Sequence, residues 1–232
     1  MPTPVKQQIT SWSYSRLQVY RKCPAQAKYK FILKLPEPGS PAMDRGTAIH
    51  KLAEQFIKGE IKKLPPELKL YAAEFKAEYK SKATKLAECD WAFTSGWLPT
   101  EWNNWKGAWV RVKVDYISRP APEYAEMRDW KTGKTGLNDL PGTGVYEQLM
   151  LYAVAGFKMW PELQEVKCIG SYLDHGQDKE ATYMRDALPK LVTYFDKESR
   201  AMLRDTAFKA TPSDFACRYC AYAKSRGGPC EF

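Results

Sequence analysis

The chain has 232 residues, 44% of them hydrophobic and 13% aromatic, so it can bury a sizeable core. This composition excludes an intrinsically disordered chain and a small disulfide-stapled scaffold. With 36 basic and 27 acidic residues the formal net charge is +9. That excess favours a polyanionic partner, nucleic acid first, although many basic proteins bind no nucleic acid.

No apolar run approaches the roughly 20 residues that a membrane-spanning helix needs. The first nine residues show no apolar signal-peptide core, and neither end carries a lipidation motif. We therefore expect a soluble cytoplasmic protein (in the host cytoplasm if the chain is viral) with no membrane partner. Six cysteines in such a compartment argue against disulfides.

Hydrophobic periodicity predicts helices first, then a β-hairpin, a further helix and more strands. This order predicts an α/β fold with a central mixed β-sheet flanked by helices, in a single domain over residues 1–232. The predicted helices are 14–33, 45–58, 67–88, 144–160 and 187–207, and the predicted strands are 107–118, 124–131, 165–173 and 180–185.

The predicted helix 45–58 carries an apolar stripe with His50 at its edge. This histidine is either a metal ligand or a hydrogen-bonded residue at the boundary of the core. The predicted helix 144–160 brings Gln148 and Tyr152 onto one face, because they are four residues apart. They either touch a nucleic-acid backbone or flank the core.

Five of the eight tryptophans lie between residues 91 and 109. Interleaved with basic residues, they could stack on the bases of a single strand. The alternative is that they pack a long loop onto the sheet, which the cost of exposing tryptophan favours. The five are Trp91, Trp97, Trp102, Trp105 and Trp109.

The two strands of the predicted hairpin gather charge. In the first strand, Arg111, Lys113 and Asp115 alternate with apolar residues that face the core. In the second strand, Asp129 and Lys131 are two residues apart and point to the same side. If the strands pair, the two aspartates approach each other, and close carboxylates repel unless a cation lies between them.

Mg²⁺ or Mn²⁺ suits such a pair of carboxylates, because hard cations prefer oxygen ligands. Lys131 beside them could orient a metal-bound water or stabilise charge on a phosphorus centre. An ordinary surface hairpin with a salt bridge is the alternative.

These motifs occur together and in order, and the ordered set resembles the RecB-like branch of the PD-(D/E)XK nuclease superfamily, whose core is restriction-endonuclease-like. The resemblance covers nearly the whole chain. Val114 stands where the nominal Pro-Asp has proline, and Asp129 stands where glutamate is commoner. The matching segments are Ser13-Tyr14-Ser15-Arg16-Leu17, Tyr20, Cys23-Pro24, Arg45-Gly46-Thr47-Ala48-Ile49-His50, Val114-Asp115, Asp129-Trp130-Lys131-Thr132-Gly133 and Gln148-Leu149-Met150-Leu151-Tyr152.

The resemblance implies a DNA nuclease, with an exonuclease at DNA ends favoured, that leaves 5′-phosphates in recombination, repair or DNA processing. A helicase or an annealing protein is the implied protein partner. A structure-specific endonuclease or CRISPR-type processing nuclease, and a non-cleaving nucleic-acid-binding module, are the alternatives.

The resemblance also implies a role for each matching residue. Catalysis would fall to Asp115, Asp129 and Lys131. The ligands of Mg²⁺ or Mn²⁺ would be His50, both aspartates and the backbone carbonyl of Trp130. We expect the DNA contacts to come from Gln148, Tyr152, Arg111 and Lys113.

Three cysteines in the tail 210–232 suggest a metal-binding knuckle that needs a fourth ligand. The AddB nuclease domain and the CRISPR-adaptation nucleases, which the chain resembles, hold a [4Fe–4S] cluster with one N-terminal and three C-terminal cysteines. Zinc on the same thiolates, or no metal, is the alternative. The remaining Cys89 and Cys168 are predicted to be core thiols. The implied cluster ligands are Cys23, Cys217, Cys220 and Cys230, with a Cys220–Cys230 gap longer than the family's usual spacing.

Overall fold

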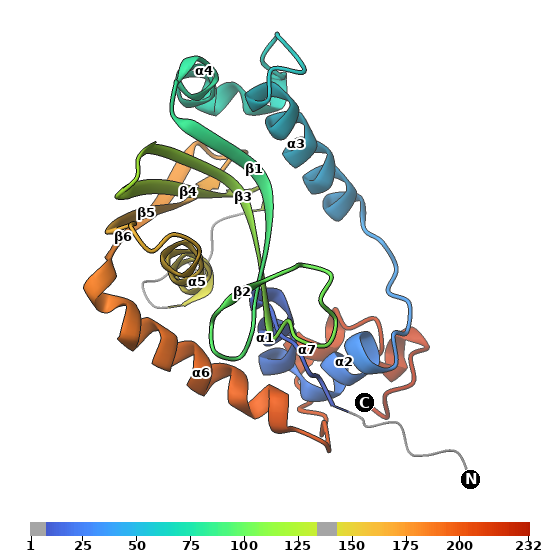
Figure 1. The fold of residues 1–232 in the computed structure, drawn as a ribbon. Helices are drawn as coiled ribbons and strands as arrows, with labels where there is room; N and C mark the ends of the chain where they lie inside the picture. Colours follow the sequence, from blue (N-terminus) through green and yellow to red (C-terminus); the bar gives the residue numbers. More distant parts are fainter. Residues whose placement is uncertain (1–7, 134–142) are drawn as a thin grey trace. The chain divides into compact units, whose positions relative to one another are not determined.

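The computed structural model describes residues 8–133 and 143–232 (Figure 1). The chain divides into two compact units. One contains the described residues up to Gly39 together with Tyr194–Phe232, and the other is Ser40–Thr193. A single domain over residues 1–232 therefore stays a prediction. Among the described helices, none is long and apolar enough to cross a membrane.

A six-stranded mixed sheet forms the centre of the second unit, which confirms the predicted α/β class (Figure 1). The strand order is β2-β1-β3-β4-β5-β6, and neighbours are antiparallel except β4 and β5, which are parallel. A parallel pair needs a crossover connection, and the helix α5 lies between these two strands in the chain. The strands are β1 (Thr84–Phe93), β2 (Pro99–Thr100), β3 (Val110–Ala121), β4 (Tyr124–Lys131), β5 (Glu165–Tyr172) and β6 (Gln177–Met184).

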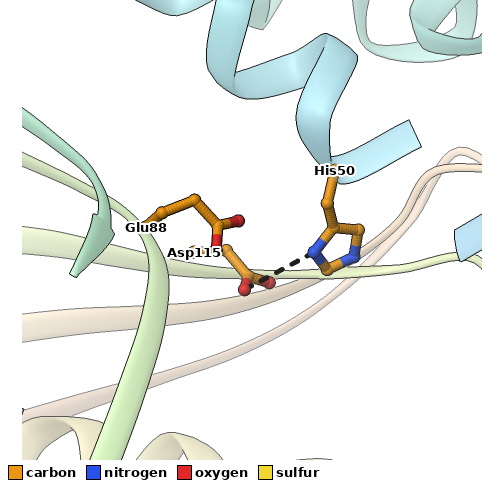
Figure 2. Close-up of side chains that lie close together, drawn as sticks. All are labelled: His50, Glu88 and Asp115. Atoms are coloured by element: carbon orange, nitrogen blue, oxygen red, sulfur yellow. Dashed lines mark ion pairs between the residues drawn. The ribbon is translucent and has the colours of Figure 1, made fainter. Parts of the chain in front are cut away.

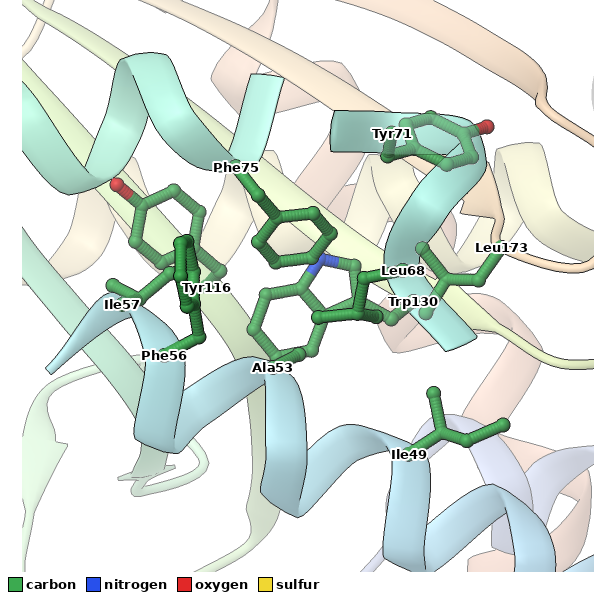
Figure 3. Close-up of a cluster of buried hydrophobic side chains, with 10 residues drawn as sticks. All are labelled: Ile49, Ala53, Phe56, Ile57, Leu68, Tyr71, Phe75, Tyr116, Trp130 and Leu173. Atoms are coloured by element: carbon green, nitrogen blue, oxygen red, sulfur yellow. The ribbon is translucent and has the colours of Figure 1, made fainter. Parts of the chain in front are cut away.

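Helices cover both faces of this sheet. On one face, α3 (Pro41–Ile57), η2 (Pro66–Tyr71) and α4 (Ala72–Lys80) enclose an apolar cluster (Figure 3). On the other face, α5 (Gly144–Met159) packs so closely on β4 that a side chain at Gly156 would collide with Met127. The cluster contains Ile49, Ala53, Phe56, Ile57, Leu68, Tyr71, Phe75, Tyr116, Trp130 and Leu173.

Two of the predicted helices, 14–33 and 67–88, are not single helices in the structure. The predicted helix 67–88 is wrong over its last turns, because α4 ends at Lys80 and β1 begins at Thr84. Strong helix formers there, such as Leu86 and Ala87, pair with β3 instead, so tertiary pairing outweighs local preference. The predicted helix 14–33 is interrupted before Pro24, since proline is accepted in a helix mainly at its first turn.

The other unit joins segments from the two ends of the chain. Trp12 stacks on Phe195 with ring centroids 5.8 Å apart, and the Tyr20 hydroxyl donates to Asp205 at 2.9 Å. The helix α6 (Leu188–Arg204) runs across the boundary between the units, after η4 (Arg185–Ala187). The remaining helices of this unit are α1 (Tyr14–Lys22), α2 (Pro24–Ala27), η1 (Lys28–Ile32), α7 (Asp214–Arg218) and η5 (Lys224–Arg226).

Candidate active site

The predicted hairpin of β3 and β4 forms, and the two strands separate where their aspartates lie. Tyr116 pairs with Arg128, and one further step in the same register would pair Asp115 with Asp129. The pairing ends before that step, and the Asp115 carboxylate accepts a 2.7 Å hydrogen bond from the Trp130 N–H instead. Both aspartates are buried, with exposed fractions of 7% and 3%. Two carboxylates therefore lie in the gap between neighbouring strands.

Three potential metal ligands converge at this gap (Figure 2). His50 of α3, Glu88 of β1 and Asp115 of β3 each offer one donor atom, and these atoms all lie within 4.8 Å of one another. His50 Nδ1 is 3.5 Å from Asp115 Oδ1. The imidazole meets the Trp130 ring edge-on, with centroids 5.9 Å apart, so the apolar cluster behind it supports its position. We call these three residues the ligand cluster.

Glu88 is the member of the ligand cluster that sequence reasoning missed. Ala87 pairs with Tyr116 and Cys89 with Val114, so Glu88 lies across from Asp115 in the sheet. Its backbone has φ of 53°, a left-handed conformation that is uncommon for residues other than glycine. Strained backbone of this kind is concentrated at functional sites. A strand prediction for 84–93 would have placed this glutamate next to Asp115 as a candidate metal ligand.

Asp129 is held by residues of β4 and α5. Its Oδ1 accepts hydrogen bonds from Gln148 Nε2 at 2.7 Å and from the Tyr152 hydroxyl at 2.8 Å. Its Oδ2 lies 2.6 Å from Lys131 Nζ, which also donates to Gln148 Oε1 at 2.9 Å. The predicted Gln148–Tyr152 face of the helix therefore contacts this carboxylate, and Tyr152 is buried. The residue lies outside the ligand cluster but beside it.

The two basic residues predicted to contact DNA differ in exposure. The Lys113 side chain is 53% exposed and forms ion pairs with Glu88 at 2.9 Å and with Asp90 at 3.8 Å. Arg111 is only 9% exposed, and its Nε donates to the Trp102 carbonyl at 3.1 Å. Lys113 thus lies next to the ligand cluster, whereas Arg111 lies four residues before Asp115 on β3.

The charges in the site shift the titration of its buried groups. Burial raises the pKa of the Asp115 carboxyl, and the charge of Asp129 adds to the rise against the opposing hydrogen bond with His50. Burial alone would lower the pKa of His50, but its hydrogen bond to Asp115 and the nearby carboxylate charges raise it. Burial and the charge of Asp129 raise the pKa of Tyr152 well above its usual value, so this hydroxyl stays a donor at neutral pH.

The donor set fits Mg²⁺ or Mn²⁺. Carboxylate oxygens are the ligands that these hard cations prefer, and Glu88 and Asp115 supply them. Asp129 Oδ2 is buried and lies 2.6 Å from the Lys131 ammonium, so this carboxylate is held as an anion beside the ligand cluster. A backbone hydrogen bond joins Trp130 to His50, which brings the Trp130 backbone into the same site.

We expect Mn²⁺ to stabilise the protein more strongly as the pH rises from about 6 to about 8. The cation must displace protons from His50 and Asp115, whose pKa values are both raised. The metal-free protein should show the opposite trend. A histidine whose pKa rises on folding adds stability below the unfolded value of about 6.5, and this stability is lost as the pH rises through the folded pKa.

Thermal denaturation across that pH range, with and without Mn²⁺, measures how the Tm of the metal-bound and the metal-free protein depends on pH. A Mn²⁺-induced increase in Tm that is constant, or that shrinks as the pH rises, would contradict a site built on these two residues.

The four predicted cluster cysteines line one cavity of the first unit, together with α2 and α7. All four are free thiols. Although partial burial opposes it, backbone hydrogen bonds from Thr211 and Gln26 lower the pKa of Cys23, which favours the thiolate that metals bind. Of the other two cysteines, Cys168 is buried in β5 as predicted, whereas Cys89 of β1 is only half-buried and not a core thiol.

A glycine explains how the long gap after Cys220 is accommodated. The chain makes the short turn η5 and then passes so close to Tyr222 that a side chain at Gly228 would lie 2.2 Å from its backbone. Cys230 N then donates to the Tyr222 carbonyl at 2.9 Å. This return brings Cys230 to the cavity that Cys217 also lines.

Comparison with known proteins places the fold. The chain shares 15% identity with protein SSO0001, whose crystal structure matches over 92% of this chain and 84% of that one with a TM-score of 0.50. A protein from Eubacterium rectale, provisionally named an exonuclease, shares 11% identity over 84% of this chain and 80% of that one, with a TM-score of 0.49. No curated protein matches. Residues 11–225 match the PD-(D/E)XK nuclease superfamily, and the chain belongs to that superfamily.

Proposed function

We propose that the protein is a divalent-metal-dependent deoxyribonuclease of the RecB-like branch that acts on DNA ends and leaves 5′-phosphates. Membership of the superfamily gives the reaction class. The observation that carries the proposal is the convergence of His50, Glu88 and Asp115 on one donor site. The Asp129–Lys131 ion pair lies beside that site and supplies the basic group that phosphoryl chemistry needs.

Each residue of the site has a role that follows from its contacts. A divalent cation, when bound, lowers the pKa of a coordinated water and neutralises the scissile phosphate. The Trp130 N–H fixes the orientation of Asp115. Gln148 bridges Asp129 and Lys131, and so keeps the ammonium near the position where charge develops on phosphorus. The 3′-oxygen leaves without help from a 2′-hydroxyl, so DNA is a suitable substrate.

Digestion of labelled DNA tests this function. We expect linear DNA, labelled at either end, to be degraded with Mg²⁺ or Mn²⁺ and to survive in EDTA. Covalently closed circles should survive under both conditions. Equal cleavage of circles would favour the structure-specific or CRISPR-type endonuclease. DNA binding without any cleavage would favour the non-cleaving module and defeat the proposal.

We further propose that Cys23, Cys217, Cys220 and Cys230 hold a [4Fe–4S] cluster. The support is that these four thiols line one cavity. Zinc on the same four thiolates is the alternative, and the metal content of the purified protein separates the two.

Protein purified without oxygen should be brown and contain about four iron atoms per chain. Cys23→Ser should lose most of the iron and lower the Tm, since the cluster would cross-link the two ends of the chain within one unit. Cys89→Ser is the matched control, because Cys89 lies in β1 of the other unit. One zinc atom per chain, or iron retained in Cys23→Ser, would overturn the assignment.

A further inference from the structure

We propose that Trp105, with Trp102 and Arg111, forms a stacking site for the bases of single-stranded DNA that leads to the ligand cluster. The inference rests on the proposed nuclease function and deepens it, because it names the form of DNA that the site accepts.

Trp105 differs from its tryptophan neighbours in exposure. It is 72% exposed, whereas Trp91 is 8% and Trp97 is 3% exposed. Trp91 packs edge-on against Trp160, and Trp97 packs against Trp109. Packing of the loop onto the sheet therefore accounts for the buried members of this stretch and leaves Trp105 without that explanation. An exposed indole presents an aromatic face on which a nucleic-acid base can stack.

The exposed indole is mounted on an ordered turn. Asn104 Oδ1 accepts from the Gly107 N–H at 2.9 Å, and Asn104 Nδ2 donates to Thr100 Oγ1 at 2.9 Å. The turn is tightly packed at Gly107, since a side chain there would lie 2.5 Å from the Asn104 amide and displace it. A ligand that stacks on Trp105 therefore has little backbone to order, which lowers the entropic cost of binding.

Arg111 lies against the rings of Trp105 and Trp102, and we call these three residues the platform. Its guanidinium carbon lies 4.7 Å from the centre of the Trp105 ring and 5.7 Å from the centre of the Trp102 ring. The hydrogen bond from its Nε to the Trp102 carbonyl fixes the guanidinium between the two indoles. One side of Trp105 thus carries a cation, and the open side can accept a base. Arginine and aromatic rings together are the groups that stack single-stranded bases irrespective of sequence.

The platform and the ligand cluster share one face of β3. The register between β1 and β3 runs without a shift from Val110 to Arg119, so Arg111, Lys113 and Asp115 point to the same side. Four residues at 3.3 Å each separate the first and last of these by about 13 Å. That distance corresponds to about four nucleotides at the 3.4 Å rise of B-form DNA, and to fewer in a stretched strand.

Charge along this face favours stacking over phosphate attraction. Lys113 lies between the platform and the cluster, but Glu88 and Asp90 already pair with it. The two carboxylates therefore partly cancel the attraction of Lys113 for a DNA phosphate. Away from the ligand cluster, affinity for DNA must come from the aromatic surface of Trp105. Separated bases can stack on an exposed indole, whereas the bases of a duplex are covered by one another. The inference is therefore specific to single strands.

Fluorescence anisotropy with a labelled 20-nucleotide single strand, in EDTA so that no cleavage occurs, measures this binding. We expect Trp105→Ala to weaken it about 5- to 100-fold. The dependence of affinity on salt should not change, because no phosphate contact is removed. Trp105→Phe should stay within about threefold of wild type, since it keeps an aromatic face. Trp105→Leu should resemble Trp105→Ala, because it keeps apolar volume without that face.

Leu98→Ala is the matched control, because Leu98 is 66% exposed on the same connection between β1 and β3. It should bind the single strand as wild type does. Wild-type affinity in Trp105→Ala, or equal losses in Leu98→Ala, would overturn the inference. So would an equal loss of duplex binding. Loss of self-association in Trp105→Ala with unchanged DNA affinity would assign the surface to a second copy of the chain instead.

A scan of abasic nucleotides provides a second test. In wild type, one abasic position within about four nucleotides of the cleaved bond should weaken binding, and in Trp105→Ala the same position should have no further effect. Binding that is indifferent to abasic position would contradict stacking. The inference and the proposed function can fail separately. If the wild-type protein binds in this pattern but never cleaves DNA, only the nuclease function is refuted. If the wild-type protein cleaves DNA and Trp105→Ala leaves binding unchanged, only the stacking site is refuted.

Discussion

Asp115→Asn should lower DNA cleavage by at least about 10³-fold and abolish stabilisation by Mn²⁺. Asp115 is the one carboxylate that both belongs to the ligand cluster and lies in the gap between β3 and β4. Loss of its charge removes a metal ligand and several kcal/mol of charge stabilisation in the transition state, and each 1.36 kcal/mol is about tenfold in rate. Single-turnover cleavage of a labelled single strand, and Tm with and without Mn²⁺, measure the two effects.

The metal-free Tm separates this effect from unfolding. Burial and the charge of Asp129 raise the pKa of Asp115, so its ionised form destabilises the metal-free fold at neutral pH. Asparagine removes that charge and keeps an oxygen for the Trp130 N–H. The metal-free Tm of Asp115→Asn should therefore equal or exceed that of wild type. Residual cleavage near the wild-type rate would remove this residue from the catalytic centre.

Much of this site could be predicted from local patterns in the sequence. Alternation in 107–118 and 124–131 predicts the hairpin, and the structure pairs these strands. The four-residue spacing of Gln148 and Tyr152 predicts a shared helical face. That this face holds Asp129 could not be predicted from spacing, because it depends on the parallel crossover from β4 through α5 to β5.

Glu88 shows where local patterns fail. The segment before it reads as the end of a helix, since residues such as Leu86 and Ala87 favour helices. In the sheet, these residues pair with β3, so long-range pairing decides their conformation. The left-handed backbone of Glu88 adds a second feature that propensities do not encode. The same limit applies to Trp105, whose exposure depends on the turn around Asn104.

Glu88→Gln should lower cleavage on the order of 10²-fold and weaken Mn²⁺ binding, because it neutralises one donor of the ligand cluster. Excess Mn²⁺ should restore part of the rate, since His50 and Asp115 remain as donors. Titration of Mn²⁺ against the rate, with the metal-induced change in Tm as a second measurement, would show the weakened affinity.

Asp90→Asn is the matched control for Glu88→Gln. Asp90 lies on the same strand and face, two residues away, and shares the ion pair with Lys113, but it is not a member of the ligand cluster. If Glu88 acts through the metal, Asp90→Asn keeps the wild-type dependence on Mn²⁺. If Glu88 only neutralises Lys113, the two variants behave alike, and excess Mn²⁺ rescues neither. That second pattern would take Glu88 out of the metal site and leave His50 and Asp115 as its donors.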